Sequence, residues 1–409
     1  MKNCIIAQSG GPTVAINASL AGVVEECITS HAYDTVYGSL RGIMGVLNND
    51  IIDLTEKVTK DNHFLDTLKI TPAMYLGSCR YKMPSAEEKP EIYDQIFSFF
   101  EEKEIKGFFY IGGNDSMDTV LQLSKYAKAH NKDVTIMGIP KTIDNDLCHT
   151  DHTPGFGSAA KYIAATLTEI AYDISIYPVK SVTIVEIMGR DAGWLTAAAA
   201  LARTEYGLGV DLIYLPEVAF DREQFVADVA AVMEKKNNVL VAISEGIRDK
   251  CGQYISASTA STDSFGHSQL SGAGKALEYL IADRLGTKVR SIEINLPQRC
   301  AAHLSSATDL EESAELGRTA VRNALKGVTG HMSVITRTSD APYTVAYDVA
   351  NIAEIANEVR NVPRSFINEA GNDVTAEMLT YLRPLIVGEP TITYKDGIPQ
   401  YASFQHLYR

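Results

Sequence analysis

The chain has 409 residues and a formal net charge of −14, with 45% hydrophobic and 22% charged residues. Because single hydrophobic cores stop growing at about 250–300 residues, this length predicts two domains, and the composition is typical of a globular protein. The negative charge disfavours nucleic acid and anionic membranes as partners. An anionic substrate would therefore be small and held by a few arginine and lysine side chains.

The cysteines and the N-terminus bear on the compartment. The six cysteines form no CxxC pair and have no regular spacing, which argues against zinc and against a disulfide framework. No apolar run approaches the roughly 20 residues that span a bilayer, and the first residues lack the charged region and apolar run of a signal peptide. We expect a cytoplasmic protein with no membrane partner.

Short apolar runs alternate with amphipathic stretches along the chain, as expected for βα units on a largely parallel sheet. The first series comprises 4–8, 15–30, 107–111, 117–130 and 134–139. After the segment 153–157, a second series comprises 182–187, 192–203, 211–215, 222–235, 239–244, 272–285 and 289–294. The sequence therefore predicts two α/β lobes.

Two glycine turns follow predicted strands, at 9–12 (Ser-Gly-Gly-Pro) and at 111–116 (Ile-Gly-Gly-Asn-Asp-Ser). Gly10 and Gly11 would let backbone N–H groups approach a phosphate closely, although a tight turn with a purely structural role would have the same sequence. In the second turn, Asp115 or Ser116 could simply cap a helix. Neither turn is a Walker A loop, because no GKS or GKT follows.

The segment 140–146 (Pro-Lys-Thr-Ile-Asp-Asn-Asp) is the densest in charged groups. Its carboxylates have a chemical use, since one can take a proton from a hydroxyl while the other orients it or helps hold a metal–phosphate. Lys141 can neutralise transferred charge. The alternative is a solvated turn that carries these residues by accident.

Basic residues are scattered at predicted strand ends and in loops. Each of them alone is interpreted as a surface charge. Together they would suit a phosphorylated substrate, because guanidinium groups pair bidentately with phosphate oxygens. Spacing alone does not show that they converge. The residues are Arg80, Lys180, Arg190, Arg290 and Arg299.

Over roughly residues 1–330, the order of the motifs resembles that of the phosphofructokinase family. The motifs are GGP at 10–12, GS-x-R at 77–80, GGNDS at 112–116, PKTIDND at 140–146, MGR-x-x-G at 188–193, SEG at 244–246 and QR at 298–299. The resemblance implies an α/β fold of two Rossmann-like lobes with largely parallel sheets and the active site in the cleft between them. It implies a phosphoryl-donor lobe of 1–151 plus about 297–375. Residues 152–296 and the C-terminal segment would form the lobe that binds fructose 6-phosphate.

The resemblance also implies roles for the catalytic residues. Asp144 would deprotonate the 1-hydroxyl of fructose 6-phosphate, with Asp146 and Thr142 beside it. Arg190 would lie near the reacting hydroxyl, and Arg80 would bridge the transferring phosphoryl group and stabilise the charge that develops there.

For the sugar phosphate, the family's motifs imply contacts from one chain and from its neighbour. Lys180 and Arg290 would reach the sugar phosphate of an adjacent subunit, which implies a homo-oligomer with shared active sites. The substrate-binding residues of the same chain would be Thr142, Ile143, Asp144, Met188, Gly189, Arg190, Glu245, Gln298 and Arg299.

Three departures from the family pattern concern the donor and the metal. Asn114 stands where ATP-using members have the aspartate that binds magnesium, so a direct metal ligand at Asn114 is in doubt and Mg²⁺ would be held mostly by pyrophosphate and water. Asp115 and Lys141 replace glycines and resemble the pyrophosphate-using branch, in which the aspartate occupies the space of a nucleotide α-phosphate. Leu296 replaces a histidine that contacts the sugar phosphate in bacterial ATP-dependent members.

The leading interpretation is reversible phosphoryl transfer in glycolysis from pyrophosphate to fructose 6-phosphate, with Gly10, Gly11, Asp115 and Lys141 in the donor site. One alternative is the same reaction with ATP. A more remote alternative is a non-catalytic sugar-phosphate sensor with the same fold, although the intact Asp144 and Asp146 argue against it.

Overall fold

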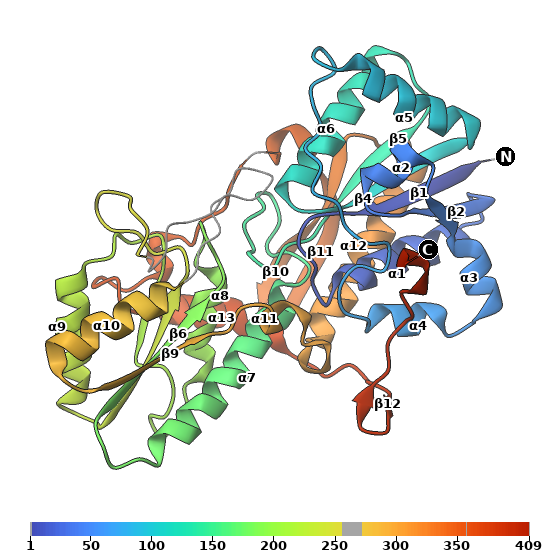
Figure 1. Ribbon diagram of the computed structural model, residues 1–409. Helices are drawn as coiled ribbons and strands as arrows, with labels where there is room; N and C mark the ends of the chain where they lie inside the picture. The colour runs from blue at the N-terminus through green and yellow to red at the C-terminus, as the bar shows by residue number, and fades with distance from the viewer. Residues whose placement is uncertain (1, 256–271, 357, 409) are drawn as a thin grey trace.

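The computed structural model describes residues 2–255, 272–356 and 358–408. It has two lobes side by side, each built on its own sheet (Figure 1). This is the predicted two-lobed α/β fold. Among the described residues, no helix is long and apolar enough to cross a membrane.

The first lobe contains a seven-stranded sheet in the order β11-β10-β5-β4-β1-β2-β3. The central pairs β1–β2, β1–β4, β4–β5 and β5–β10 are parallel, whereas β3 and β11 pair antiparallel at the two edges. The strands are β1 (Asn3–Gln8), β2 (Thr35–Ser39), β3 (Ile51–Asp53), β4 (Ile105–Gly112), β5 (Thr135–Pro140), β10 (His331–Asp340) and β11 (Tyr343–Asn351).

Helices cover both faces of this sheet, which is why its central strands are apolar on both sides. One face packs against α1 (Ile16–Thr29), α3 (Leu54–Lys60), α4 (Phe64–Lys69) and α12 (Ala307–Leu325). The other packs against α2 (Ile43–Asn48), α5 (Pro90–Glu102) and α6 (Asn114–Ala129). Glycines let α1 and α12 touch, because a Cβ on Gly22 would lie 2.0 Å from the Ala314 carbonyl oxygen.

The second lobe contains a four-stranded parallel sheet in the order β7-β8-β6-β9. Its strands are β6 (Ser181–Ile187), β7 (Leu212–Tyr214), β8 (Asn238–Ser244) and β9 (Lys288–Glu293). One face packs against α7 (Phe156–Ser175), α8 (Trp194–Ala197) and α13 (Ala376–Leu382). The other packs against α9 (Arg222–Met233) and α10 (Ala273–Leu285).

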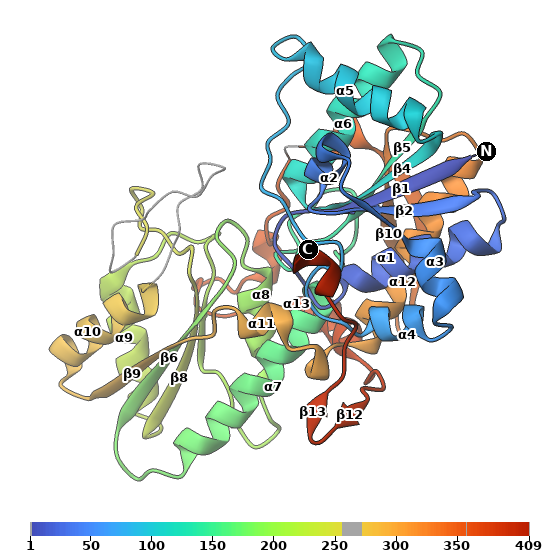
Figure 2. The same ribbon diagram turned by 45° about the vertical axis from the view of Figure 1, so that its right-hand side comes forward.

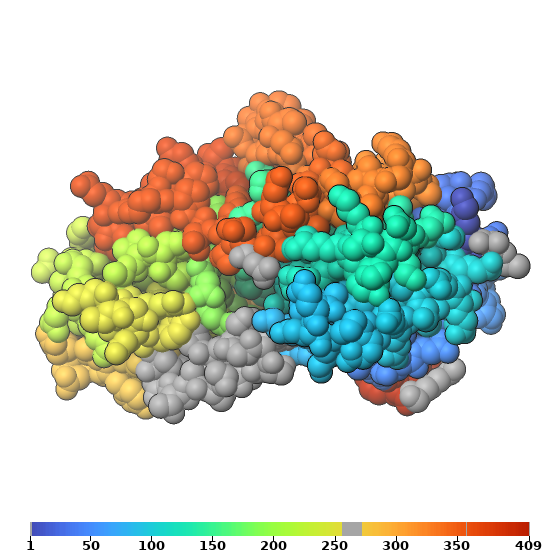
Figure 3. Space-filling view, turned by 90° about the horizontal axis from the view of Figure 1, so that it is seen from above, coloured from blue at the N-terminus to red at the C-terminus, as the bar shows by residue number. Residues whose placement is uncertain are grey.

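The chain after residue 297 crosses between the lobes more often than the resemblance implied. It passes through α11 (Pro297–Cys300) and then adds α12, β10 and β11 to the first lobe. Residues Val362 to Leu385 then enter the core of the second lobe, whereas Ala402, Phe404 and Leu407 pack against the first. In Figure 3 the orange and light red part of the chain lies along one side of both lobes, whereas the dark red end appears on the opposite side of the first lobe.

Residues 362–387 therefore pack into the core of the second lobe, and the end of the chain returns to the first. The segment 362–387 is made of short turns and one short helix, and its apolar residues are buried against Trp194 and α7 rather than paired in a strand. Such packing leaves no periodic pattern in the sequence.

Candidate active site

The carboxyl ends of three adjacent strands meet at one edge of the larger sheet. The last residue of β1 pairs with Ile111 of β4, and Gly112 at the end of β4 pairs with Pro140 of β5. The Lys141 N–H donates to the Gly112 carbonyl oxygen at 2.9 Å, which ties the two turns together. The segments 9–12, 112–116 and 140–146 thus form one site, as ligand sites do in open α/β sheets.

Gly10 and Gly11 allow two basic side chains to approach the first turn. Gly10 has φ +84, and a Cβ there would lie 3.1 Å from Lys141 Nζ. A Cβ on Gly11 would lie 3.4 Å from Nη1 of Arg299, which follows the last strand of the second lobe. The glycine backbone, Lys141 and Arg299 therefore form a positively charged cradle where the lobes meet.

Lys141 is buried in this cradle beside three acidic side chains. Burial lowers the pKa of its ammonium to about 8, while Asp144, Asp146 and Asp115 oppose the shift. Asp115 itself is exposed in the first turn of α6. The carboxylates favour the protonated form of Lys141 close to neutral pH, so that its ammonium is suited to an anionic ligand.

Asp144 and Asp146 are only partly accessible to solvent. Burial raises the pKa of Asp144, opposed by the charges of Lys141 and Arg190. Burial and repulsion from Asp144 raise the pKa of Asp146 to about 7. Two carboxyls with raised pKa values beside an arginine and a lysine suit a proton acceptor that works near neutral pH.

The loop that carries these aspartates is held by hydrogen bonds at both ends. The Asp144 N–H donates to the Thr142 hydroxyl at 3.1 Å, and the Thr153 hydroxyl donates to the Thr142 carbonyl oxygen at 2.8 Å. Asn145, at φ +56, donates from its amide to the Tyr381 hydroxyl at 2.8 Å. Ile143 is buried in the core of the second lobe, so only its main chain is available to a ligand.

The second lobe brings three further motifs to the same place. The Met188 N–H donates to the Gln298 amide oxygen at 3.3 Å, and the Gly189 N–H donates to Glu245 at 3.3 Å. Burial and the charge of Asp144 raise the pKa of Glu245 to about 7. The segments 188–190, 244–246 and 298–299 therefore face the Asp144 loop.

Arg190 is held close to these motifs, and its charge acts on Asp144. A Cβ on Gly246 would lie 1.8 Å from the Arg190 carbonyl oxygen, so only glycine fits there. Arg190 also lines a cavity of about 520 Å³ with Asp191 and Glu217. Its Nε atom is buried without a hydrogen-bond partner among the described residues, which leaves this donor available to a ligand.

Arg80 lies at the end of a loop that touches the first glycine turn. Its neighbour Ser78 donates from the hydroxyl to the Gly10 carbonyl oxygen at 2.7 Å. The Arg80 charge acts on Arg299, whose pKa is lowered mainly by burial. Arg80 therefore joins the cradle from the first lobe.

One candidate metal ligand, Asn114, lies at the start of α6. The Asn114 Oδ1 atom is buried and has no hydrogen-bond partner in the part of the chain that the structure describes. Within the same part of the chain, no group of three or more acidic, histidine or cysteine side chains is arranged to hold a metal ion. One unpaired amide oxygen fits a metal that takes most of its ligands from substrate and water.

Lys180 and Arg290 are not brought to the Asp144 cluster of the same chain. Lys180 is exposed just before β6, at the end of that strand away from Met188. Arg290 is exposed on β9, an edge strand that pairs with β6. Both therefore lie where a second molecule could reach them.

The similarity to known proteins decides the family. The phosphofructokinase family model matches residues 3–292. The pyrophosphate–fructose 6-phosphate 1-phosphotransferase of Xanthomonas campestris is 40% identical over 99% of this chain and 96% of its own length. The chain belongs to the phosphofructokinase family.

Two further phosphofructokinases support this assignment over the full length. The pyrophosphate–fructose 6-phosphate 1-phosphotransferase of Halomonas elongata is 39% identical over 98% of this chain and 95% of its own length. The crystal structure of a pyrophosphate-dependent phosphofructokinase from Nitrosospira multiformis has a TM-score of 0.88 and 35% identity, and covers 98% of this chain and 95% of that one. The family assignment thus extends to both lobes and to the C-terminal segment.

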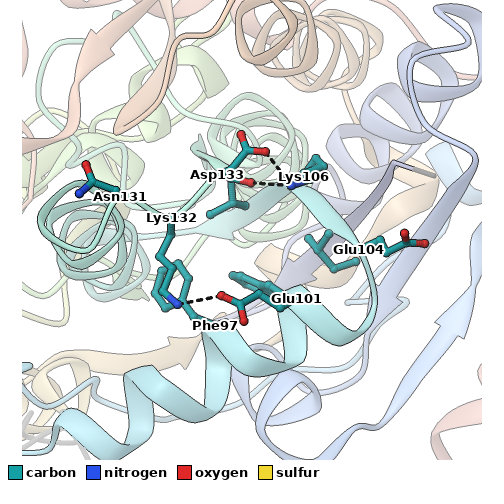
Figure 4. A pocket seen from close by; sticks show the side chains of 10 residues that line it. Phe97, Glu101, Glu104, Lys106, Asn131, Lys132 and Asp133 are labelled. Atoms are coloured by element: carbon teal, nitrogen blue, oxygen red, sulfur yellow. Dashed lines mark hydrogen bonds and ion pairs between the residues drawn. The ribbon is translucent and has the colours of Figure 1, made fainter.

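A second cavity of this phosphofructokinase, drawn in Figure 4, has a volume of about 410 Å³ and is lined by none of the site residues described above. It is lined by α5 and by the residues that begin β4 and precede β5, at the opposite end of those strands. Its lysines are already paired, Lys132 with Glu101 at 2.8 Å and Lys106 with Asp133 at 2.6 Å. These pairs leave this cavity poorly suited to a phosphate.

A buried ionic network behind the aspartate loop was missed by the sequence analysis. His152 contacts Asp151 through Nδ1 at 2.8 Å and Glu312 of α12 through Nε2 at 2.6 Å. The Tyr381 hydroxyl, which binds Asn145, donates to the Asp151 carbonyl oxygen at 2.7 Å. The members of this network come from three separate segments, the loop with Asp151 and His152, α12 with Glu312 and α13 with Tyr381. Only the closeness of His152 to the aspartate motif was visible in the sequence.

This network predicts that stability falls as pH rises. Burial alone would lower the pKa of His152, but Glu312 and Asp151 outweigh it and raise the pKa from 6.5 to about 9. Because the pKa of His152 is higher in the folded protein than in the unfolded chain, protonation of His152 stabilises the folded state. This contribution, roughly 3 kcal/mol, is complete below about pH 6.5 and is lost as the pH rises through about 9. We expect Tm to fall over that window in the unaltered protein and to fall less in His152→Gln.

Calorimetry from pH 6 to pH 10 would measure the effect, with the exposed His63→Gln as the matched control. The His63 variant should follow the unaltered protein. Parallel curves for His152→Gln and the unaltered protein would contradict a charged, stabilising His152.

Proposed function

We propose that the protein transfers a phosphoryl group from pyrophosphate to the 1-hydroxyl of fructose 6-phosphate, giving fructose 1,6-bisphosphate and phosphate, reversibly, in glycolysis. The observation that carries the proposal is Asp144, a partly buried carboxyl with a raised pKa between the cations of Lys141 and Arg190. The names of the full-length relatives support the same reaction.

In the forward reaction, Asp144 takes the proton of the 1-hydroxyl as that oxygen attacks a phosphorus of pyrophosphate. The new bond joins the sugar oxygen to phosphorus, the bridging P–O bond breaks, and phosphate leaves. Arg80, Arg190 and Lys141 offset the negative charge that builds up on the transferring and leaving groups. Asp146, two residues after Asp144 and with its own raised pKa, would orient the base.

The acceptor is assigned to the surface shared by the two lobes. Glu245 and Met188 would hold the sugar hydroxyls, with Gly189, Gln298 and the main chain of Ile143 shaping the pocket. Arg299 would bind the 6-phosphate through its guanidinium fork. Thr142 would contact the sugar beside the reacting hydroxyl.

The donor assignment rests on Asp115 and Lys141. A carboxylate at the start of α6 would repel an adenine nucleotide that continues past the second phosphate, whereas pyrophosphate ends before it. Lys141 Nζ, beside Gly10, supplies a charge to a donor that has no adenosine to anchor it. These residues favour pyrophosphate over ATP as the donor.

We assign Mg²⁺ to the donor site. Asn114 Oδ1 is the protein oxygen best placed to contribute, with water or pyrophosphate oxygens filling the remaining positions. When bound, Mg²⁺ would neutralise charge on pyrophosphate and fix its orientation. Turnover that continues unchanged after chelation with EDTA would argue against this assignment.

The exposed positions of Lys180 and Arg290 support active sites shared between subunits in a homo-oligomer. Several apolar side chains beside them are exposed as well, which suits a protein interface. These side chains are Tyr172, Ile176, Tyr177 and Val179. A cytoplasmic location goes with the glycolytic role, and visible secretion of the native protein would contradict it.

Mixing two inactive variants tests the shared site. Asp144→Ala chains and Arg290→Ala chains, combined under conditions of subunit exchange, should regain part of the activity, because some mixed sites carry neither substitution. The assay is turnover before and after mixing, with each variant mixed with itself as the control. Absence of recovery in verified mixed oligomers would contradict the shared site.

Product analysis separates this function from the two alternatives. Fructose 6-phosphate and magnesium pyrophosphate should give fructose 1,6-bisphosphate and phosphate. Turnover with ATP alone would favour the ATP-dependent reaction. Tight binding of fructose 6-phosphate without turnover on either donor would favour a sensor.

A further inference from the structure

The C-terminal residues return to the donor site after crossing the second lobe. Figures 1 and 2 show the end of the chain lying against the first lobe. We call residues 402–408 the C-terminal strap; its last turn is the 3₁₀ helix η6 (Gln405–Tyr408). No family motif that we could place in the sequence lies in this segment.

The strap packs directly on the loop that ends in Arg80. His406 donates from Nε2 to the Tyr75 carbonyl oxygen at 2.6 Å, and its ring lies 4.4 Å from the Tyr75 ring. Phe404 contacts the same ring edge-on at 5.8 Å. The main chain and the aromatic ring of Tyr75 are therefore both held from the C-terminus.

Leu407 holds the next part of the loop. A Cβ on Gly77, which has φ +74, would lie 3.2 Å from Cδ2 of Leu407, so the leucine side chain rests on the glycine. The Leu407 carbonyl oxygen accepts a hydrogen bond from Arg41 Nη2 at 2.5 Å, and the Arg41 N–H donates to the Leu76 carbonyl oxygen at 2.7 Å. Arg41 thus links the strap to the loop a second time.

On its other side, the loop is bonded to the first strand and the glycine turn. The Leu76 N–H donates to Gln8 Oε1 at 3.0 Å, and the Tyr75 N–H donates to Asn17 Oδ1 at 2.9 Å. Ser78 donates to the Gly10 carbonyl oxygen at 2.7 Å. The loop is clamped between the strap and the turn that forms the phosphate cradle.

We infer that His406 and Leu407 of the C-terminal strap are positioning residues for the donor site, acting through the Tyr75–Arg80 loop on Arg80 and on the Gly10 turn. The inference rests on the proposed function, because the donor is the molecule that these groups would hold. It predicts an effect on pyrophosphate and little effect on fructose 6-phosphate, whose pocket is formed by Glu245, Gln298 and Arg299. Misplacing a binding group by about 1 Å can cost about 10²-fold in rate.

The test compares His406→Ala/Leu407→Ala with Tyr408→Ala, whose side chain is 86% exposed in the same terminal turn. For the double variant, KM for pyrophosphate should rise at least about 5-fold and kcat should fall up to about 100-fold. The Kd of fructose 6-phosphate, from isothermal titration, should change less than about 2-fold. Tyr408→Ala should match the unaltered protein. If the double variant does not fold, Leu407→Ala alone removes the contact with Gly77 and serves in its place.

The readouts separate positioning from general loss of structure. A fall in kcat with KM for pyrophosphate unchanged reflects a smaller fraction of folded enzyme and would overturn the inference. Kinetics equal to those of Tyr408→Ala would also overturn it. An unaltered protein that is inactive with pyrophosphate would instead contradict the proposed function.

Discussion

Replacing Asp144 with alanine should lower kcat by about 10²–10⁴-fold, because the 1-hydroxyl then loses its proton acceptor. The affinity for fructose 6-phosphate should stay nearly intact, since we propose that Met188, Glu245 and Arg299 hold the sugar phosphate. Steady-state kinetics and isothermal titration with fructose 6-phosphate measure the two effects separately.

Asp144→Asn is the matched control for shape. It keeps the size of the side chain and its place in the loop but has no basic carboxylate, so its kcat should be reduced about as much as that of the alanine variant. A variant at Asp144 with near-normal turnover would refute the assignment of the base. A large loss of sugar-phosphate binding would show instead that Asp144 holds the substrate.

The double variant Asp115→Gly/Lys141→Gly is expected to use ATP as the donor in place of pyrophosphate. Removing the exposed carboxylate relieves charge repulsion of a nucleotide α-phosphate, and removing the buried ammonium takes away the cation that compensates pyrophosphate. ATP-dependent turnover should appear, and pyrophosphate-dependent kcat/KM should fall by about 10²-fold or more. The measurement is kcat/KM with each donor under saturating fructose 6-phosphate.

The single variants complete this double-mutant cycle. Asp115→Gly alone should admit ATP poorly, because the loop with Lys141 keeps its shape for pyrophosphate. Lys141→Gly alone should lose pyrophosphate activity without gaining ATP activity. A double variant that shifts neither donor would show that these two residues do not set donor choice.

The parts of the site that follow strands could be predicted from the sequence. Gly10 follows β1 by two residues and Lys141 comes directly after β5. Because the carboxyl ends of parallel strands meet at one sheet edge, local patterns were enough to place the two residues together. Fold class and family followed from the same motifs, and the comparisons confirm both. The residue roles carried over from the family stay predictions.

The remaining features depend on contacts between distant segments. That Arg299 approaches Gly11 follows from the docking of the two lobes, which no local pattern encodes. The same is true of His152, whose partner Glu312 is 160 residues away. The sequence of the C-terminal strap has no regular hydrophobic period, and the strap follows two very short strands, β12 (Tyr394–Lys395) and β13 (Ile398–Pro399). Its place on the Tyr75–Arg80 loop is therefore known only from the packing.

Donor choice by the unaltered protein is the most direct test of the account. Formation of fructose 1,6-bisphosphate from fructose 6-phosphate and Mg²⁺ should be measured at neutral pH with pyrophosphate and with ATP, in parallel assays at equal donor concentration. We expect turnover with pyrophosphate and little or none with ATP. Turnover with ATP and none with pyrophosphate would contradict it.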